Sequence, residues 1–193
     1  MENSKPVFFD ERKTLITVFI INAALFVIEM VFGIWGNSIG LISDAFDMLA
    51  DALVYFLSIL VIGGTLQSKK KLTRYTGYFE LVIACIGFAE IVRRLLGKEE
   101  QPHFQMMIGI SLLALAANLT TVYLFTKLKS EEMHSNASRI FASNDLLANL
   151  GVIIAGVIVY FTHSNKPDLI VGFIVFLIVL KGGIKIIRSS RSK

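Results

Sequence analysis

Long apolar runs recur along the chain and are separated by short polar segments. Each run is close to the roughly 20 residues that an α-helix needs to cross a hydrocarbon layer about 30 Å thick. The runs are continuous and lack the alternation of barrel strands, so they predict helices. The predicted spans are residues 14–34, 40–63, 75–97, 105–126, 139–162 and 167–187. The pattern therefore predicts an all-α membrane protein with six transmembrane helices.

Composition agrees with this pattern and leaves little sequence for a soluble domain. The chain has 193 residues, of which 54% are hydrophobic. The first thirteen residues are polar and the run after them is too long for the apolar part of a cleavable signal peptide. We expect residues 1–13 to form a cytoplasmic N-terminal segment, residues 14–188 the six-helix domain, and residues 189–193 a short cytoplasmic tail.

The basic residues are distributed unevenly between the two ends of the predicted helices. The formal net charge is +4, but its distribution points to membrane topology and not to nucleic acid as a partner. Placing both termini inside puts all but four of the 19 Lys and Arg residues on the cytoplasmic side. The four others are Arg93, Arg94, Lys98 and Lys166. The positive-inside rule therefore predicts cytoplasmic termini.

Acidic residues within the predicted spans are the first candidates for function. An ionisable side chain in a membrane costs about 2.5–3.5 kcal/mol on insertion scales, so it points to a functional site. No Lys or Arg lies at the same depth, because Arg93 and Arg94 are near a helix end and can extend toward the surface. A carboxyl group without a basic partner is either protonated or holds a cation. The acidic residues are Glu29, Asp44, Asp47, Asp51, Glu80, Glu90 and Asp145.

Three of these acids share one face of the second predicted helix. At about 100° per residue, Asp44, Asp47 and Asp51 fall within an arc of about 60°. Asp47 and Asp51 are one turn apart, with Cβ atoms roughly 6 Å from each other, so both can contact one ion. Asp44 lies about 10 Å from Asp51 along the axis, too far to share that ion directly. It is nearer the hairpin end, where it could cap the helix or bind water.

The fifth predicted helix offers a third carboxylate. Asp145 is preceded by Asn144 and followed one turn later by Asn149. Facing the Asp47/Asp51 pair, Asp145 would give three oxygen ligands from two helices, and four-coordination then needs one more donor. The single acids Glu29, Glu80 and Glu90 are equally compatible with hydrogen bonds between helices. Asn22 and Asn118 are polar residues at mid-depth, which are more often interhelical contacts than ligands.

The segment NAALFVIEMVFGIWGNSIGLISDAFDMLADAL resembles the first two helices of the cation diffusion facilitator family. In that family an Asn, a Phe and a Glu precede a Ser-x-x-Leu-x-x-Asp-Ala segment and a metal-binding pair, [His or Asp]-x-x-x-Asp. The matching residues are Asn22, Phe26, Glu29, Gly33, Ser38, Leu41, Asp44, Ala45, Asp47 and Asp51.

The rest of the chain continues this resemblance over residues 14–188. Asn118 matches the family's fourth helix, Asp145 takes the place of a metal-binding Asp on the fifth, and Pro167 and Asp168 begin the sixth. The resemblance implies export of a divalent metal from the cytoplasm in exchange for protons, by an alternating-access homodimer. The metal ligands would be Asp47, Asp51 and Asp145, between the second and fifth helices. Second-shell or pathway roles would belong to Asp44, Asn22, Glu29, Asn118 and Asn149.

The sequence departs from the family pattern in three ways. The position four before Asp145 is Phe141, which cannot bind metal, so the fourth donor is Asn144, a residue of another helix, or water. Asp47 stands where many zinc carriers have His. Most members also carry a cytoplasmic C-terminal domain, which we do not expect here because the chain ends shortly after the last predicted helix.

Zinc is our first expectation for the transported ion, with Co²⁺, Cd²⁺, Mn²⁺ and Fe²⁺ behind it. Carboxylate and amide ligands suit Mn²⁺ or Fe²⁺, although Zn²⁺ also accepts them. The transported metal is a substrate, and no cofactor is expected. A bacterial plasma membrane is the expected location, because the chain is compact and has no eukaryotic sorting signal.

Two other functional classes are compatible with buried acids in a membrane. An intramembrane aspartyl protease would need a Gly-x-Gly-Asp segment, whereas Asp145 lies in the sequence SNDL, so we do not expect an enzyme. The alternative is a non-transporting metal sensor or assembly partner that retains the intramembrane acidic site. Vectorial metal flux by the protein alone distinguishes transport from both.

Overall fold

The computed structural model describes residues 4–61, 66–97, 100–127 and 133–191, and the side chains of residues 12–60, 74–97, 100–127 and 145–188. The described chain folds entirely into α-helices joined by turns and short loops. The helices are α1 (Ser4–Trp35), α2 (Ile39–Val61), α3 (Leu66–Leu96), α4 (Phe104–Lys127), α5 (Met133–Thr162) and α6 (Lys166–Arg191).

Each helix coincides with one of the six predicted apolar runs, so the all-α prediction is confirmed. The helices are longer than those runs where polar residues continue the same helical backbone. The first helix begins at Ser4, within the expected N-terminal segment, and α3 begins at Leu66. Apolar periodicity marks the part of a helix that can lie in lipid, and it does not mark where the backbone hydrogen bonds stop.

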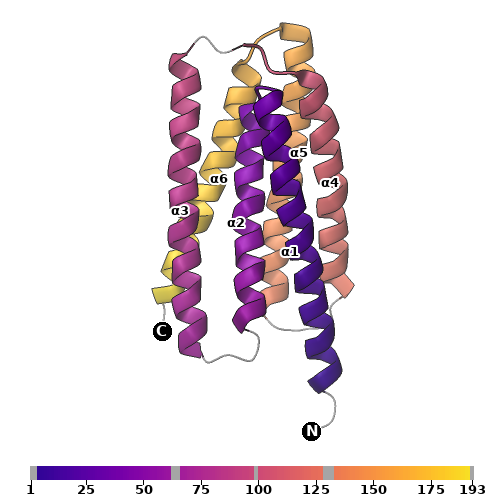
Figure 1. Cartoon of the computed structure of the whole chain (residues 1–193), viewed down its shortest axis with the longest axis vertical. Helices are drawn as coiled ribbons and strands as arrows, with labels where there is room; N and C mark the ends of the chain where they lie inside the picture. The colour runs from indigo at the N-terminus through magenta and orange to yellow at the C-terminus, as the bar shows by residue number, and fades with distance from the viewer. Residues whose placement is uncertain (1–3, 62–65, 98–99, 128–132, 192–193) are drawn as a thin grey trace.

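The helices lie side by side in one elongated bundle (Figure 1). α1 begins and α6 ends at the same end of the bundle, as six alternating helices require (Figure 1). α2 is the central element, because it contacts each of the other five helices. α3 packs beside α6, and among the described residues its helix contacts are with α2 and α6 only. The helix that carries three aspartates is therefore the most enclosed one.

A short turn places α2 directly after α1. Asn37 has φ = 51°, and the Ser38 amide donates to the Gly33 carbonyl oxygen over 2.9 Å, so the chain reverses within three residues. α6 then approaches the start of α2 closely at Gly172. A Cβ atom at Gly172 would lie 3.0–3.1 Å from Ile39, including its backbone. Glycine is needed there because any side chain would push the two helices apart.

Burial is inverted relative to a water-soluble protein. Many polar or acidic side chains are buried, whereas large apolar side chains such as Leu96 (84% exposed) and Phe161 (74% exposed) cover the outside. This distribution suits a protein surrounded by lipid. Four helical segments are long and apolar enough to cross a membrane: Arg12–Trp35, Phe104–Lys127, Asp145–Thr162 and Lys166–Arg188. The protein is therefore a membrane protein.

Candidate metal-binding site

The acidic face of α2 lies inside the bundle. Asp44, Asp47 and Asp51 are all buried, with at most 7% of each residue exposed. Apolar residues of α2 such as Ala45 and Met48 are equally buried. This part of α2 is therefore covered by other helices on several sides, as its central position requires. The three carboxyl groups lie within that enclosure.

α5 brings Asp145 to the same level as the pair on α2. The Asn149 side-chain amide donates a hydrogen bond of 2.5 Å to Asp44 Oδ2, which fixes the register of the two helices. Because α5 runs antiparallel to α2 (Figure 1), four residues before Asn149 corresponds to four residues after Asp44. Asp145 therefore lies at a depth between Asp47 and Asp51, and only 4% of it is exposed.

Among the residues whose side chains the structure describes, the charged groups that act on Asp145 are carboxyl groups. They are, in decreasing order of strength, Asp51, Asp47, Asp44 and Glu29. Because their negative charges would repel one another, such a group is stable only when protons or cations reduce its charge. The structure thus brings together the acids of α1, α2 and α5 that the sequence singled out.

Several oxygen atoms in this group accept no hydrogen bond from any residue that the structure describes. They include Asp51 Oδ2. Asp44 Oδ1 and both carboxyl oxygens of Glu29 also lack a donor, although the Asp44 and Glu29 carboxyl groups interact directly with each other. Buried polar atoms are normally paired, so unpaired ones need a proton, an ion or water. Within the described part of the chain, no three Asp, Glu, His or Cys side chains are arranged in this structure to hold one metal ion together.

Two predicted positions on α5 fall outside the described side chains. Asn144, the candidate fourth ligand, and Phe141, the position without a ligand, both belong to the helical backbone of α5. Helical spacing places Phe141 one turn before Asp145. The contacts of these two side chains are not among those that the structure describes.

The two mid-depth asparagines differ in their contacts. Asn22 donates to the Val18 carbonyl oxygen of its own helix over 2.9 Å, so this contact does not join two helices. Asn118 is completely buried on α4, and neither its amide nitrogen nor its oxygen has a partner among the described residues. These contacts do not test the pathway roles of Asn22 and Asn118, which stay predictions.

Tyr55 is a neighbour of the site that the sequence pattern did not single out. It lies one turn after Asp51 and interacts electrostatically with Asp51, Asp145 and Asp47. Its ring packs against Phe125 of α4, with ring centroids 5.8 Å apart. Its position four residues after Asp51, on the same face of α2, could have identified it from the sequence as a neighbour of the acids.

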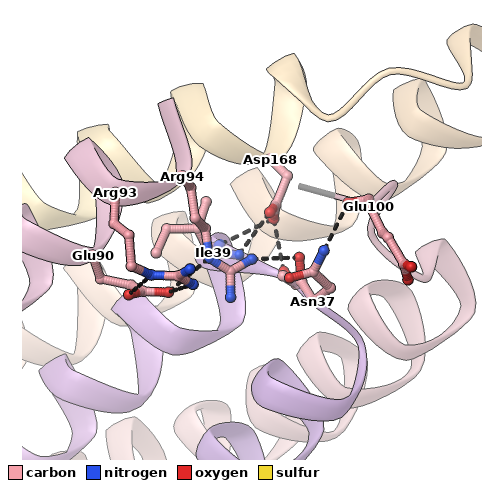
Figure 2. Close-up of polar contacts among 9 residues, drawn as sticks. Asn37, Ile39, Glu90, Arg93, Arg94, Glu100 and Asp168 are labelled. Atoms are coloured by element: carbon pink, nitrogen blue, oxygen red, sulfur yellow. Dashed lines mark hydrogen bonds and ion pairs between the residues drawn. The ribbon is translucent and has the colours of Figure 1, made fainter. Parts of the chain in front are cut away.

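Asp168 of α6 holds the other end of α2 in place (Figure 2). Its Oδ1 accepts hydrogen bonds from Ser38 Oγ (2.7 Å) and the Gly40 amide (3.0 Å), and its Oδ2 accepts one from the Ile39 amide (2.6 Å). Ser38 Oγ also accepts a hydrogen bond from the Leu41 amide over 3.2 Å. A carboxylate of one helix thus satisfies free amides at the start of another helix.

Glu90 corrects one expectation from the sequence. The sequence groups it with acids that lack a basic partner, but it forms ion pairs with Arg93 (2.8 Å) and Arg94 (2.9 Å), as Figure 2 shows. Arg94 is buried and donates to the Asn37 carbonyl oxygen over 2.6 Å, so it does not extend toward the surface. Residues three and four apart on a helix are neighbours, so the spacing could have predicted both pairs. Glu90 is therefore part of the structural contacts around the α1–α2 turn.

Known proteins match this chain along nearly all of its length. The zinc transporter ZitB of Pectobacterium atrosepticum is 27% identical, over 92% of this chain and 59% of its own length. The cadmium, cobalt and zinc/H(+)-K(+) antiporter of Bacillus subtilis is also 27% identical, over 93% of this chain and 62% of its own. ZitB of Escherichia coli K12 is 25% identical, over 94% and 62%. The chain thus spans about three fifths of the length of these relatives.

A family model matches in the same region. The model of the cation efflux transmembrane domain covers residues 15–193, which include all the buried acids of α1, α2 and α5 described above. The match agrees with the resemblance carried by the first two helices. The chain therefore belongs to the cation efflux (cation diffusion facilitator) family, a family of transporters and not of enzymes.

Proposed function

We propose that this protein exports a divalent metal ion from the cytoplasm, with Asp47, Asp51 and Asp145 as ligands. The observation that carries this proposal is the buried group of carboxyl groups between α2 and α5 whose charged neighbours are themselves carboxyl groups. A divalent cation is the natural ligand of such a group. Asp44, Asn149 and Glu29 adjoin these ligands and orient or hydrate them.

Proton antiport follows from the same chemistry. One divalent cation and two protons neutralise the same charge on a pair of carboxylates. Since both bind the same oxygens, a site that alternates between the two sides of the membrane exchanges metal for protons. The Bacillus subtilis relative is a cadmium, cobalt and zinc/H(+)-K(+) antiporter, which supports this part of the proposal.

Zinc is the proposed first substrate, followed by Co²⁺, Cd²⁺, Mn²⁺ and Fe²⁺. The names of the relatives favour zinc, cadmium and cobalt. The donors proposed here are oxygen atoms, which also suit Mn²⁺ and Fe²⁺. The choice among these ions is therefore part of the test.

The proposed arrangement in the membrane has six spans and cytoplasmic termini, in a bacterial inner membrane, with two copies forming the working unit. The uneven distribution of Lys and Arg supports the orientation. A reporter fused after Arg191 is expected to be active in the cytoplasm, and one fused after Gln101, in the α3–α4 connection, outside it. The opposite pattern would contradict the orientation.

Metal uptake into proteoliposomes tests the function. The wild-type protein is reconstituted alone, and Zn²⁺, Cd²⁺, Co²⁺, Mn²⁺ and Fe²⁺ uptake is followed with and without an imposed pH gradient. We expect uptake to accelerate when the vesicle interior is acidic, and apparent zinc affinity to fall as the pH on the metal side is lowered. Zinc binding without uptake would instead support a sensor or assembly role, and uptake that does not respond to pH would rule out the antiport.

A further inference from the structure

Glu80 is a buried acid on α3 that the proposed function leaves unused. Only 3% of the residue is exposed, and its side chain lies at the contact between α3 and α6. Its role could be structural, as a hydrogen-bonding group between helices. Its surroundings argue against that role.

Two consecutive glycines of α6 make room for the Glu80 side chain. A Cβ atom at Gly182 would lie 3.3 Å from Glu80 Oε1, and one at Gly183 would lie 3.2 Å from Glu80 Cβ and 3.3 Å from Oε2. Glycines have no side chain with which to donate a hydrogen bond. Glu80 Oε2 is buried and has no partner among the residues described. The glycines thus leave room for a carboxyl group whose Oε2 accepts no hydrogen bond from the described residues.

The packing of α3 on α2 places Glu80 near the depth of the aspartate pair. A Cβ atom at Gly87 would lie 3.7 Å from the Phe46 ring, which aligns these two positions. α3 runs antiparallel to α2, so seven residues before Gly87 corresponds to Leu53, seven after Phe46. Leu53 is two residues, or about 3 Å along the axis, from Asp51. Glu80 thus lies slightly beyond Asp51, toward the α2–α3 connection.

Glu80 also interacts electrostatically with the pair. Asp47 acts on Glu80, and Glu80 acts on Asp51. These three acids belong to two helices, and Asp145 adds a third helix to the same group. Three observations therefore agree: Glu80 is buried with an unpaired oxygen among the described residues, it lies in a space that glycines leave open, and it interacts with both metal-binding candidates on α2.

We infer that Glu80 is a cation ligand from α3, which binds the divalent ion together with Asp47, Asp51 and Asp145. This inference rests on the proposed function and addresses its open question, because Phe141 supplies no ligand and a residue of another helix is one of the three donors left open there. Binding would draw these carboxyl groups together around the ion. Glu has one methylene more than Asp, so its carboxyl group can reach an ion near α2 from the α3 backbone.

The position of Glu80 also gives it a place in the path of the ion. The α2–α3 connection lies on the cytoplasmic side in the proposed topology. An ion coming from that side meets Glu80 before or together with Asp51. The additional ligand is a carboxylate oxygen, which extends the selectivity toward ions that prefer oxygen ligands, such as Mn²⁺ beside Zn²⁺.

Zinc binding by purified variants tests the inference. The variants are Glu80→Gln, which removes the charge at nearly constant shape, Glu80→Asp, and the control Glu100→Gln, which makes the same change at an exposed position. Zn²⁺ affinity is measured by calorimetry in detergent, and the KM and kcat of zinc uptake are measured in proteoliposomes. Loss of even an outer partner of a metal site costs roughly 10- to 100-fold in affinity. We expect Glu80→Gln to weaken binding and raise KM by at least about tenfold, and Glu80→Asp to restore part of the loss.

The outcomes separate this inference from the proposed function. If wild type and Glu100→Gln transport zinc and Glu80→Gln matches them in affinity and KM, Glu80 is not a ligand and the proposed function stands. If wild type transports none of the five divalent ions named above, the proposed function fails and the inference falls with it.

A measurement on the wild-type protein covers the case in which Glu80→Gln does not fold. Buried carboxyl groups are labelled with an apolar carbodiimide, with and without Zn²⁺, and the sites are quantified by mass spectrometry. Zinc is expected to reduce labelling of Glu80 several-fold and to leave that of the ion-paired Glu90 unchanged. Equal labelling of Glu80 with and without zinc would overturn the inference.

Discussion

Carboxyl groups set the chemistry of this protein at the scale of single residues. A buried acceptor left without a partner costs about 1–3 kcal/mol, and more when it is charged. Asp44, Asp51, Glu29 and Glu80 each have at least one such oxygen among the described residues. Acids of this kind are best explained by a bound cation or proton that satisfies them.

The position without a ligand on α5 gives a test of selectivity. Phe141 lies one turn before Asp145, so His at this position would offer an imidazole to the same ion. Imidazole favours Zn²⁺ over Mn²⁺ more strongly than carboxylate does. We predict that Phe141→His increases the ratio of zinc to manganese uptake in proteoliposomes. A matched Phe141→Leu variant, which offers no ligand, is expected to leave the ratio unchanged, and an unchanged ratio in Phe141→His would place the missing ligand elsewhere.

The resemblance placed Asp47, Asp51 and Asp145 between the second and fifth helices, and all three are buried, as is Asp44, for which the sequence suggested a capping or water-binding role. The sequence did not predict the pairing of Glu90, because Arg94 was expected to reach the surface and is instead buried. The spacing of three and four residues between Glu90 and the two arginines already allowed both ion pairs.

At the scale of elements, the packing of α2 is the main determinant of the site. α2 lies against five helices, and α6 approaches its first turn closely through Gly172. Asp168 then caps the same turn. The acids on α2 are therefore held at one end by contacts unrelated to metal binding.

The close approach of α6 to α2 predicts different effects for two glycines. Gly172→Ala places a methyl group 3.0–3.1 Å from Ile39, including its backbone, and is expected to lower the thermal unfolding midpoint in detergent. Gly109→Ala, on α4, meets nothing within 4 Å and gains helix propensity of about 0.5–1 kcal/mol, so its midpoint should stay or rise. Equal midpoints for the two variants would contradict the observed packing.

The cap on α2 predicts a similar contrast between two serines. Ser38→Ala removes the hydrogen bonds to Asp168 and to the Leu41 amide, at a cost of about 1 kcal/mol. Ser58→Ala removes a bond of 2.8 Å to the Val54 carbonyl oxygen within its own helix, and is expected to have little effect. Unfolding midpoints measured under identical conditions check this, and a larger loss for Ser58→Ala would be inconsistent with the cap.

The apolar pattern predicted where the helices lie along the sequence, but it did not predict which helices pack against one another. Periodicity identifies a buried face but does not say which helix covers it, so the central position of α2 emerged only from the structure. The contact between Asp168 and Ser38 joins residues 130 positions apart and depends on how α6 packs.

At the scale of the whole molecule, the apolar outer surface and the acidic interior are both consistent with a membrane protein that binds cations. Apolar side chains face lipid, and the described polar interior is acidic along α2 and α5, with basic side chains concentrated toward helix ends. Such an interior attracts cations and excludes anions. The family membership and the geometry therefore lead to the same proposal, export of a divalent metal.

The initial rate of zinc uptake into proteoliposomes by Asp51→Asn, compared with Glu100→Gln and wild type, tests the central claim most directly. Both substitutions exchange one carboxylate for an amide, at a buried and an exposed position respectively. We predict that Asp51→Asn loses nearly all uptake while remaining folded, and that Glu100→Gln retains the wild-type rate. Wild-type uptake by Asp51→Asn would contradict the claim that the buried acids of α2 carry the metal.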